Sequence, residues 1–451
     1  MTRELHLNLF IHGRGHHEAS WRHPRSTGEP LTDIGYFQKL AATAERGRFD
    51  SMFLADHLVL NKQIEHRAAD GLEPITTLAA LAGATSRLGL IATASATFTE
   101  PFNLARQFAS VDHISGGRVG WNIVTSWAKD VESNFSRSQG YDHDERYERA
   151  HEFVEVVTAL WDSWAEDAVV DDPVSGLYVE PSRVRPIDYR GRYQQVRGPL
   201  NIPRPVQGRP VLVQAGSSGP GRRFAARFAE AVFTAQMHID GARDFYADIK
   251  AEVRRQGRRE DSLLVLPGIS PVLGSTDAEA RQLQDELREL SLADVGLAHL
   301  SARFGGADLS HLALDQRLSV EDLPPAQGVQ GAQSRAVLIA EFVRSERPTL
   351  RELLDKLAGG RGHFVVVGSP ERIADTIEEW FRSGAADGFN VMPPLLPASL
   401  EDFVEFVVPL LQQRGLLRRD YSGTTLREHY GLARPENQLF APASVPAGGV
   451  A

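Results

Sequence analysis

The chain has 451 residues, of which 42% are apolar and 24% charged, so it is long enough to bury the core of a soluble globular protein. Its net charge of -10 argues against nucleic acid or an anionic membrane as the main partner, because both bind a basic face. Without any cysteine, it has no disulfide, thiolate metal site or cysteine nucleophile. The N-terminus lacks a signal-peptide pattern and no stretch approaches the roughly 18 apolar residues of a membrane span, so we expect a cytoplasmic protein.

Strand-like and helix-like patterns alternate along the chain. The strand candidates are residues 5–11, 51–55, 88–94, 119–124, 210–215, 231–235, 263–272 and 388–392. Helical patterns occur at residues 34–48, 75–85, 102–114, 146–164, 222–231 and 400–414. This alternation favours parallel strands, and eight candidates indicate an α/β fold of the (β/α)8 TIM barrel type. An open doubly wound sheet is the alternative, but "IHGRGHHEAS" after the first strand lacks the third glycine of its nucleotide fingerprint.

Two segments interrupt this alternation. Residues 166–208 are rich in Pro, Gly, Asp and Arg, and residues 277–362 are mostly helical and too long for an ordinary connection. We interpret both as insertions into one barrel domain of residues 1–435, with the helical insertion before the last strand covering the barrel mouth. Residues 436–451, which end in APASVPAGGVA, are expected to form a flexible tail.

In a barrel, the carboxyl ends of the strands meet at the face that carries the chemistry. The predicted strand ends hold His12, Asp56, His57, Thr93 and Asn122. Asp56 is the only acid of this set, which disfavours a hydrolase with paired carboxylates. No His-Glu-x-x-His pattern or other ligand spacing predicts a metal site. These groups suit hydrogen bonding around a polar planar ligand.

The stretch "PVLVQAGSSGPGRRFAARFA" (210–229) predicts a strand that leads through Gly-Ser-Ser-Gly into a helix. Backbone N–H groups at a helix start lack intrahelical partners, and the helix dipole favours an anion there. A phosphate would fit this turn. An ordinary turn with a serine cap is the other interpretation.

Four motifs together resemble the flavin-dependent monooxygenases of the bacterial luciferase-like superfamily: "FLADHL" (53–58), "WNIVTS" (121–126), "ERYERAHEF" (145–153) and "QAGSSGPG" (214–221). More narrowly, the chain resembles the branch with nitrilotriacetate monooxygenase component A, dibenzothiophene sulfone monooxygenase and long-chain alkane monooxygenase. The resemblance runs from "WRHP" (21–24) to "RDYSGTTLREHYGL" (419–432), nearly the whole chain. One departure is Ser136, where many relatives have glycine, which leaves the path of that loop open.

The resemblance implies FMN at the carboxyl ends of the strands. The matching cofactor positions are Asp56, Thr93, Asn122, His143, Tyr147, Ser217 and Ser218. The first three match contacts to the flavin ring or its ribityl chain. His143 and Tyr147 match ribityl and phosphate contacts, and the two serines would hold the phosphate.

The resemblance also implies a two-component oxygenase, which takes reduced FMN from a separate flavin reductase and uses O2 to oxygenate a small organic substrate. A homodimer or homotetramer is expected. His12, His17 and His57 are the candidate catalytic residues, since histidine can move protons near neutral pH. A deazaflavin-dependent oxidoreductase, a non-catalytic flavin-binding protein and a sugar-binding or hydrolytic barrel are the alternatives.

The substrate is the least determined part of this prediction. Arg14, Arg22 and Arg25, in and near the first loop, could attract a carboxylate, or they could be solvated loop residues. A small N- or S-containing organic anion is our hypothesis for the substrate.

Overall fold

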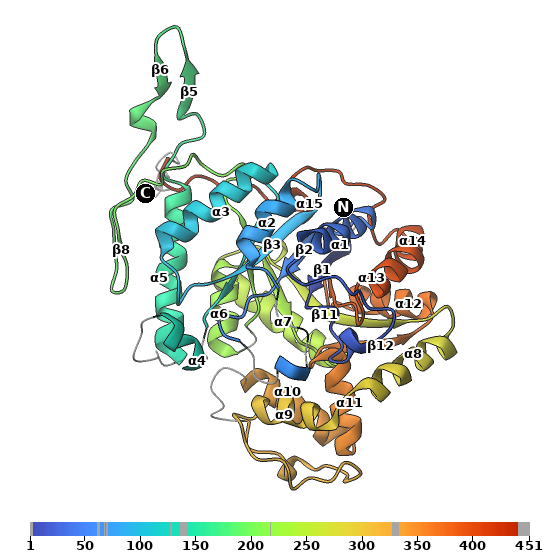
Figure 1. Cartoon of the computed structure of the whole chain (residues 1–451). Coiled ribbons are helices and arrows are strands. Elements are labelled where there is room, and N and C mark those ends of the chain that lie inside the picture. Colours follow the sequence, from blue (N-terminus) through green and yellow to red (C-terminus); the bar gives the residue numbers. More distant parts are fainter. Residues whose placement is uncertain are drawn as a thin grey trace, which may run out of the picture.

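The computed structural model describes residues 3–60, 64–66, 68, 71–126, 129–135, 143–216, 218–326 and 333–440. Within them, eight parallel strands close into a barrel (Figure 1): β1 (His6–Ile11), β2 (Ser51–Leu54), β3 (Gly89–Ser95), β4 (Val119–Val124), β9 (Val211–Gln214), β10 (Ala231–Thr234), β11 (Leu264–Leu273) and β13 (Gly388–Val391). Pairing of β1 with β13 closes the ring. All eight strand candidates lie in this barrel, so the predicted (β/α)8 fold is confirmed.

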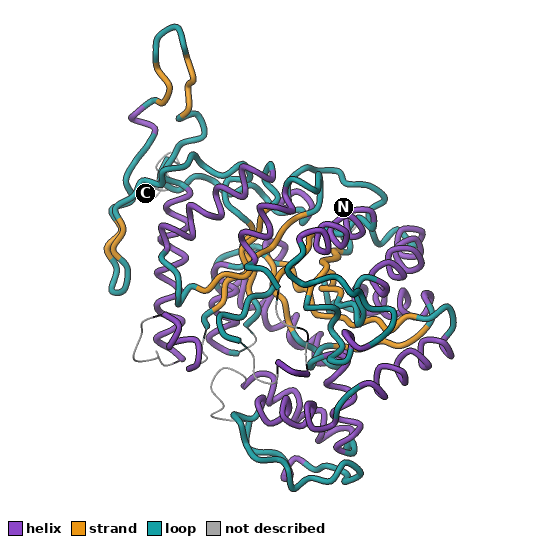
Figure 2. The backbone as a smooth tube through the Cα atoms, in the orientation of Figure 1, coloured by secondary structure: helices purple, strands orange, loops and turns teal. Residues whose placement is uncertain are grey.

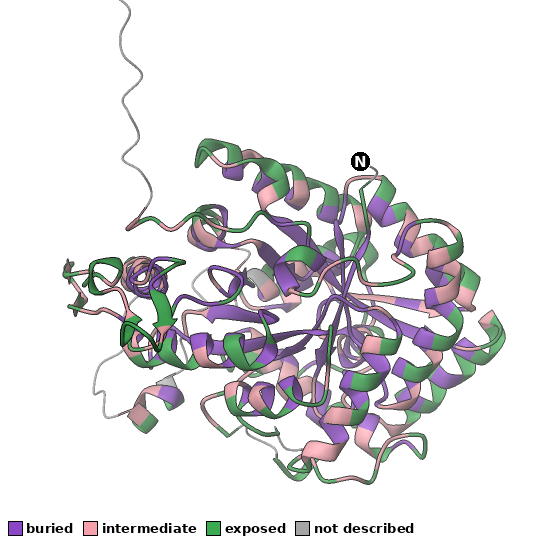
Figure 3. Ribbon diagram, turned by 90° about the horizontal axis from the view of Figure 1, so that it is seen from above, coloured by how far each residue is buried: buried purple, intermediate pink, exposed green. Residues whose placement is uncertain are grey.

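Helices surround the barrel as an outer layer, as Figures 2 and 3 show. They are α1 (Ile34–Arg46), α2 (Pro74–Ala82), α3 (Pro101–Ser115), α5 (His143–Trp161), α6 (Gly219–Phe228), α7 (Ile239–Arg255), α12 (Pro370–Arg382), α13 (Ala398–Asp402) and α14 (Val408–Gln413). The expected helix over 222–231 is displaced towards the N-terminus, because Ser218 caps α6 and Ala231 belongs to β10. None of the described helices is long and apolar enough to cross a membrane.

Alternation of side chains along the strands separates two layers of core. In β1, Leu7 and Leu9 pack outward against the helices, whereas Phe10 packs inside the barrel against Phe53 and Phe233. The short helix α15 (Leu426–His429) adds Leu426 to the inner cluster. The inner core therefore fills the barrel below the carboxyl ends of the strands.

The first interruption consists of two hairpins that project from the barrel (Figure 1). They are formed by β5 (Val169–Asp172) with β6 (Leu177–Val179), and by β7 (Tyr189–Arg190) with β8 (Gln195–Val196). Val174 and Tyr178 of the first hairpin are 95% and 66% exposed, so this hairpin contributes apolar surface rather than core.

The second interruption carries α8 (Asp277–Leu290), α9 (Ala293–Arg303), α10 (Gln333–Glu346) and α11 (Leu350–Gly360), followed by β12 (Phe364–Gly368). A separate hydrophobic cluster joins α9, α10 and α11. The strand β12 pairs with the outer half of β11, from Ile269 opposite Phe364 to Leu273 opposite Gly368. The predicted helical insertion before the last strand is thus confirmed, and both of its ends meet at β11.

Candidate active site

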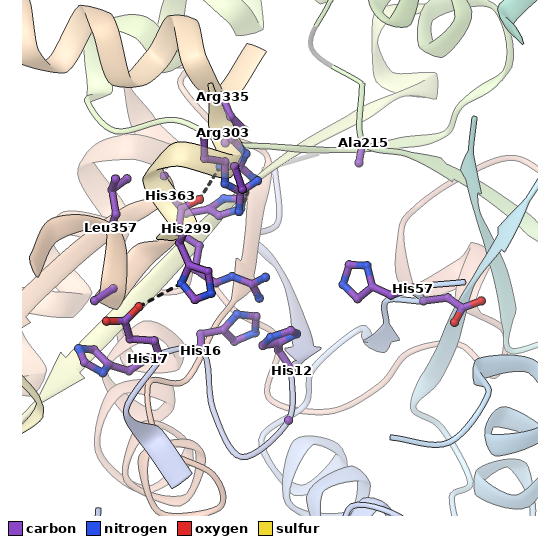
Figure 4. A pocket seen from close by; sticks show the side chains of 18 of the residues that line it. His12, His16, His17, His57, Ala215, His299, Arg303, Arg335, Leu357 and His363 are labelled. Atoms are coloured by element: carbon purple, nitrogen blue, oxygen red, sulfur yellow. Dashed lines mark hydrogen bonds and ion pairs between the residues drawn. The ribbon is translucent and has the colours of Figure 1, made fainter. Parts of the chain in front are cut away.

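A pocket of about 1040 Å³ lies at the carboxyl ends of the barrel strands. One wall consists of residues that end or follow the barrel strands, and the other consists of residues from α9, α10 and α11. Figure 4 shows His57 and Ala215 on one side of this pocket, and Arg303, Arg335 and His363 on the other. We call the first side the strand-end lobe.

Hydroxyl and amide groups support each other in the strand-end lobe. The Asn122 side-chain amide donates to the Thr93 hydroxyl oxygen over 2.9 Å, which leaves the Thr93 proton available for a pocket ligand. Thr93 lines the pocket, whereas Asn122 is buried beside it and its Oδ1 has no hydrogen-bond partner. Ser126 donates to Ser95 over 2.8 Å at the neighbouring strand ends. This lobe is polar, mostly neutral and held in place by internal hydrogen bonds.

The turn between β9 and α6 borders the same lobe. Ser218 caps α6 by accepting the Gly221 N–H over 3.2 Å, so the serine cap is real, and its hydroxyl proton can still be donated to a ligand. Tyr147 of α5 lies over this turn, and its hydroxyl oxygen would be only 2.9 Å from a Cβ added at Gly221. Tyr147 and Ser218 both line the pocket. Ser217 and the side chain of His143 lie outside the described residues.

The predicted catalytic histidines all line the pocket, in different surroundings. The His12 and His57 rings approach edge to face, with 6.5 Å between their centroids, and Asp56 lies next to His57 in the pocket wall. His17 is buried and its Nδ1 accepts the Ala19 N–H over 3.2 Å, so this nitrogen stabilises the loop. Burial and nearby His23 lower the His17 pKa to about 4. The geometry therefore favours His12 and His57 for proton transfer.

His16, which the sequence suggested only as a loop or packing residue, also lines the pocket. Its Nε2 donates to the Phe10 carbonyl oxygen over 2.9 Å, and its buried Nδ1 has no hydrogen-bond partner among the described residues. Burial and the positive charge of Arg361 lower the His16 pKa to about 3. His16 is thus a neutral imidazole beside His12, whose ring centroid is 5.6 Å away.

The opposite side of the pocket is strongly basic. Arg303, Arg335 and Arg361 line it, and we call these three residues the basic lobe. Arg335 donates to the His363 Nε2 over 2.7 Å and to the Arg361 carbonyl oxygen over 3.1 Å. His363 must therefore be neutral and protonated at Nδ1, and burial together with the Arg335 charge holds its pKa well below the usual value. The His363 ring stacks on Phe233 of β10 with 4.9 Å between centroids, which joins the basic lobe to the barrel.

The arginines that the sequence suggested for an anion differ in their surroundings. Arg14 and Arg22 line the pocket, and they donate to the carbonyl oxygens of Glu29 and Leu290, which do not cancel their charge. Arg25 pairs with Asp402 over 2.6 Å. It is not among the described residues that line the pocket. Among the described residues, the first loop thus brings two guanidinium groups to the pocket, and the helical insertion brings three.

Comparison with known proteins defines the class of this site. Residues 12–387 match the family model for luciferase-like monooxygenases. The N-acetyl-S-(2-succino)cysteine monooxygenase of Bacillus subtilis (strain 168) is 46% identical over 436 residues, which cover 97% of this chain and 98% of that protein. Nitrilotriacetate monooxygenase component A of Aminobacter aminovorans is 43% identical over 454 residues, with coverage of 98% and 99%.

A solved structure of a riboflavin lyase with modified FMN and riboflavin is 31% identical, with a TM-score of 0.85 and 96% of each chain covered. The chain belongs to the luciferase-like monooxygenase family, and it is an enzyme of the monooxygenase class. Dibenzothiophene-sulfone and long-chain alkane monooxygenases are also among its relatives, at 39% and 32% identity. The branch predicted from the motifs is confirmed.

Proposed function

We propose that this monooxygenase receives reduced FMN from a separate reductase and uses O2 to oxygenate a small organic anion. The observation that carries the proposal is one pocket with two unlike sides, a neutral lobe at the strand ends and a basic lobe from the insertion. Its volume of about 1040 Å³ lies at the upper end of the range of about 300–1,000 Å³ for ligand pockets, which suits a large ligand. Two relatives are named for substrates with several carboxylates, N-acetyl-S-(2-succino)cysteine and nitrilotriacetate, which supports an anionic substrate.

The strand-end lobe fits FMN. The turn at Ser218 offers a hydroxyl and the start of α6 to a phosphate, with the Tyr147 hydroxyl beside it. Ser217 and His143 are proposed to complete this end. Thr93 and Asp56 would hold the flavin ring, with Asn122 orienting Thr93, and the buried Oδ1 of Asn122 suits a ligand N–H. Bound reduced FMN would supply the two electrons that activate O2.

The residues of the chain would orient the reactants, exclude water and move protons. Oxygenation places one oxygen atom of O2 in the substrate and releases the other as water, which requires two protons. We assign their transfer to His12 and His57, whose rings face the same space. The insertion helices cover the pocket, and removing water there protects the reaction from side reactions.

Anaerobic titration with reduced FMN tests the cofactor site directly. We expect tight binding by the wild type, and weaker binding by about tenfold or more for Ser218→Ala and Tyr147→Phe, because each loses a hydrogen bond to a charged phosphate. Tyr178→Phe, on the exposed hairpin, is the matched control and should bind as the wild type does. Reduced FMN that fails to bind the wild type would contradict the proposal, and binding of a deazaflavin instead would favour that alternative.

We also propose that two copies of this chain associate through the first hairpin, in the cytoplasm. Val174 and Tyr178 are exposed apolar side chains on a projecting element, and such surface is typical of an interface. Sedimentation of the wild type and of a Val174→Asp, Tyr178→Asp double variant would test this, since the variant should sediment as a smaller species.

A further inference from the structure

We propose that Arg303, Arg335 and Arg361 form a subsite that binds the carboxylates of a dianionic substrate. This inference rests on the proposed oxygenase function, because it names the substrate class of the same pocket. The three arginines come from separate places: the last residue of α9, the first turn of α10, and the residue that follows α11. They converge only in the folded protein, and Figure 4 shows Arg303 and Arg335 together beside His363.

Arg335 is anchored by neutral acceptors. It donates to the His363 Nε2 and to the Arg361 carbonyl oxygen, and neither acceptor cancels its charge. In the part of the chain that the structure describes, no carboxylate pairs with this guanidinium. A guanidinium has five N–H donors in a planar fork, so Arg335 keeps donors for a ligand carboxylate.

The lining of the whole pocket carries more positive than negative charge. Among the described residues, six arginines line the pocket (Arg14, Arg22, Arg146, Arg303, Arg335 and Arg361). The acids in that lining are Glu18 and Asp56, and Glu18 lies 3.3 Å from the His299 Nδ1. Burial, followed by the charges of Arg303 and Arg361, lowers the Arg335 pKa to about 9. A bound carboxylate would relieve this repulsion at Arg335, and a lobe lined by three guanidinium groups offers enough donors for a second carboxylate.

The backbone at Arg361 directs two groups of this residue to the basic lobe. Arg361 follows α11 with a φ of 53°, in the left-handed region that glycine usually occupies at a helix end. The conformation brings the Arg361 side chain to the pocket and its carbonyl oxygen to Arg335.

Binding of probe molecules to the protein without turnover tests this subsite. Calorimetric titration would compare 2-(methylthio)succinate, the monoacid 3-(methylthio)propanoate and the neutral dimethyl ester of the first probe, each with flavin-free protein and with protein loaded with oxidised FMN. We expect the dicarboxylate to bind at least about tenfold more tightly than the monoacid, since a hydrogen-bonded charge pair contributes that much or more. The ester should bind weakest.

Substitutions then assign the effect to the arginines. Arg335→Gln and Arg303→Gln should each weaken dicarboxylate binding by at least about tenfold and leave the ester unaffected. Arg335→Lys, which retains the charge but loses the fork, should have an intermediate affinity. Arg344→Gln, on the exposed side of the same helix α10, is the matched control. Circular dichroism and reduced-FMN affinity should match the wild type in every variant.

The possible failures are distinguishable. A wild type that binds reduced FMN but shows no preference for the dicarboxylate would overturn the subsite and leave the oxygenase function intact. Equal losses for ester and dicarboxylate in Arg335→Gln would also overturn it, because they indicate a general change in the pocket. Dicarboxylate binding without any reduced-FMN binding would support the subsite and contradict the proposed function.

Discussion

The two sides of the pocket differ in how their polar groups are held. In the strand-end lobe, neutral groups such as Thr93 and Asn122 bond to each other from neighbouring strands of one sheet. In the basic lobe, charged groups come from helices that pack on a separate hydrophobic cluster and reach the barrel through His363. This difference supports the proposal that the barrel holds the cofactor and the insertion selects the substrate.

The largest expected effect is a loss of reduced-FMN affinity in Gly221→Ala, which alters the strand-end lobe alone. In Gly221→Ala, the added Cβ would lie 2.9 Å from the Tyr147 hydroxyl oxygen and 3.1 Å from the Gly216 Cα, so the Tyr147 side chain must move away and the turn must shift slightly. Losing about two charged hydrogen bonds to the phosphate should weaken reduced-FMN binding by about 100-fold or more, as anaerobic titration would measure. Gly219→Ala is the matched control, since its Cβ would meet only Arg223 at 3.7 Å. If dicarboxylate binding fell equally, the two lobes would not be independent.

A substitution that should affect the basic lobe alone is Gly268→Ala in β11. Its Cβ would overlap the His363 ring, which would displace that ring and with it the Arg335 guanidinium. We expect dicarboxylate affinity to fall by about tenfold, with the affinity for reduced FMN changed by less than about twofold. Gly241→Ala in α7, which does not line the pocket and whose Cβ would make an ordinary contact of 3.5 Å with the Gln236 Oε1, should alter neither affinity. A loss of FMN affinity in Gly268→Ala would contradict the proposal that the two lobes bind different ligands.

A third substitution tests what the Thr93 hydroxyl contributes to the strand-end lobe. Thr93→Val removes the pocket hydroxyl and leaves the buried Asn122 amide without its acceptor. We expect the free energy of unfolding to fall by about 1–3 kcal/mol and reduced-FMN affinity to fall by about tenfold. Thr93→Ser should restore most of both, as denaturant unfolding and flavin titration would measure. An equal loss in both variants would show that the hydroxyl group alone does not account for the effect.

The smallest expected effect is the pH dependence of stability near the insertion. His16 and His17 have folded-state pKa values of about 3 and about 4, below the unfolded value of 6.5, so the unfolded chain binds more protons as the pH falls. Stability therefore decreases as the pH drops, by about 0.7 kcal/mol per buried imidazole between pH 7 and pH 6. Denaturant unfolding at both pH values would measure this. His17→Gln, which can still accept the Ala19 N–H, should show less of the decrease than the wild type, and an unchanged decrease would contradict the assignment.

Much of the strand-end lobe could be predicted from sequence, because its positions are defined locally. Asp56, Thr93 and Ser218 each follow or end an apolar strand pattern, and parallel strands bring such positions together. The basic lobe could not be predicted in this way. Arg335 and Arg344 both lie on α10, and no local pattern tells the pocket residue from the exposed one.

Contacts with residues far along the chain give residues of the first loop roles that the sequence did not predict. Arg25 is drawn to Asp402, far along the chain, and Arg22 to the Leu290 carbonyl oxygen. His16 and His17 are adjacent in sequence, yet one lies beside His12 and the other bonds to its own loop. Such differences depend on side-chain packing between elements, which spacing along the chain does not encode.

Because β12 pairs with the outer half of β11, the helical insertion begins and ends at the same strand. It could therefore be replaced as one segment. Both ends of the segment 274–363 meet at one strand, from Ile269 opposite Phe364 to Leu273 opposite Gly368, and its helices have a hydrophobic cluster of their own. A barrel of this kind can acquire a different segment between two fixed points without rebuilding the cofactor side. Replacement of this segment in evolution would then change the substrate while the rest of the barrel is kept. Chimaeras joined at β11 and β12 would use the same principle in protein engineering.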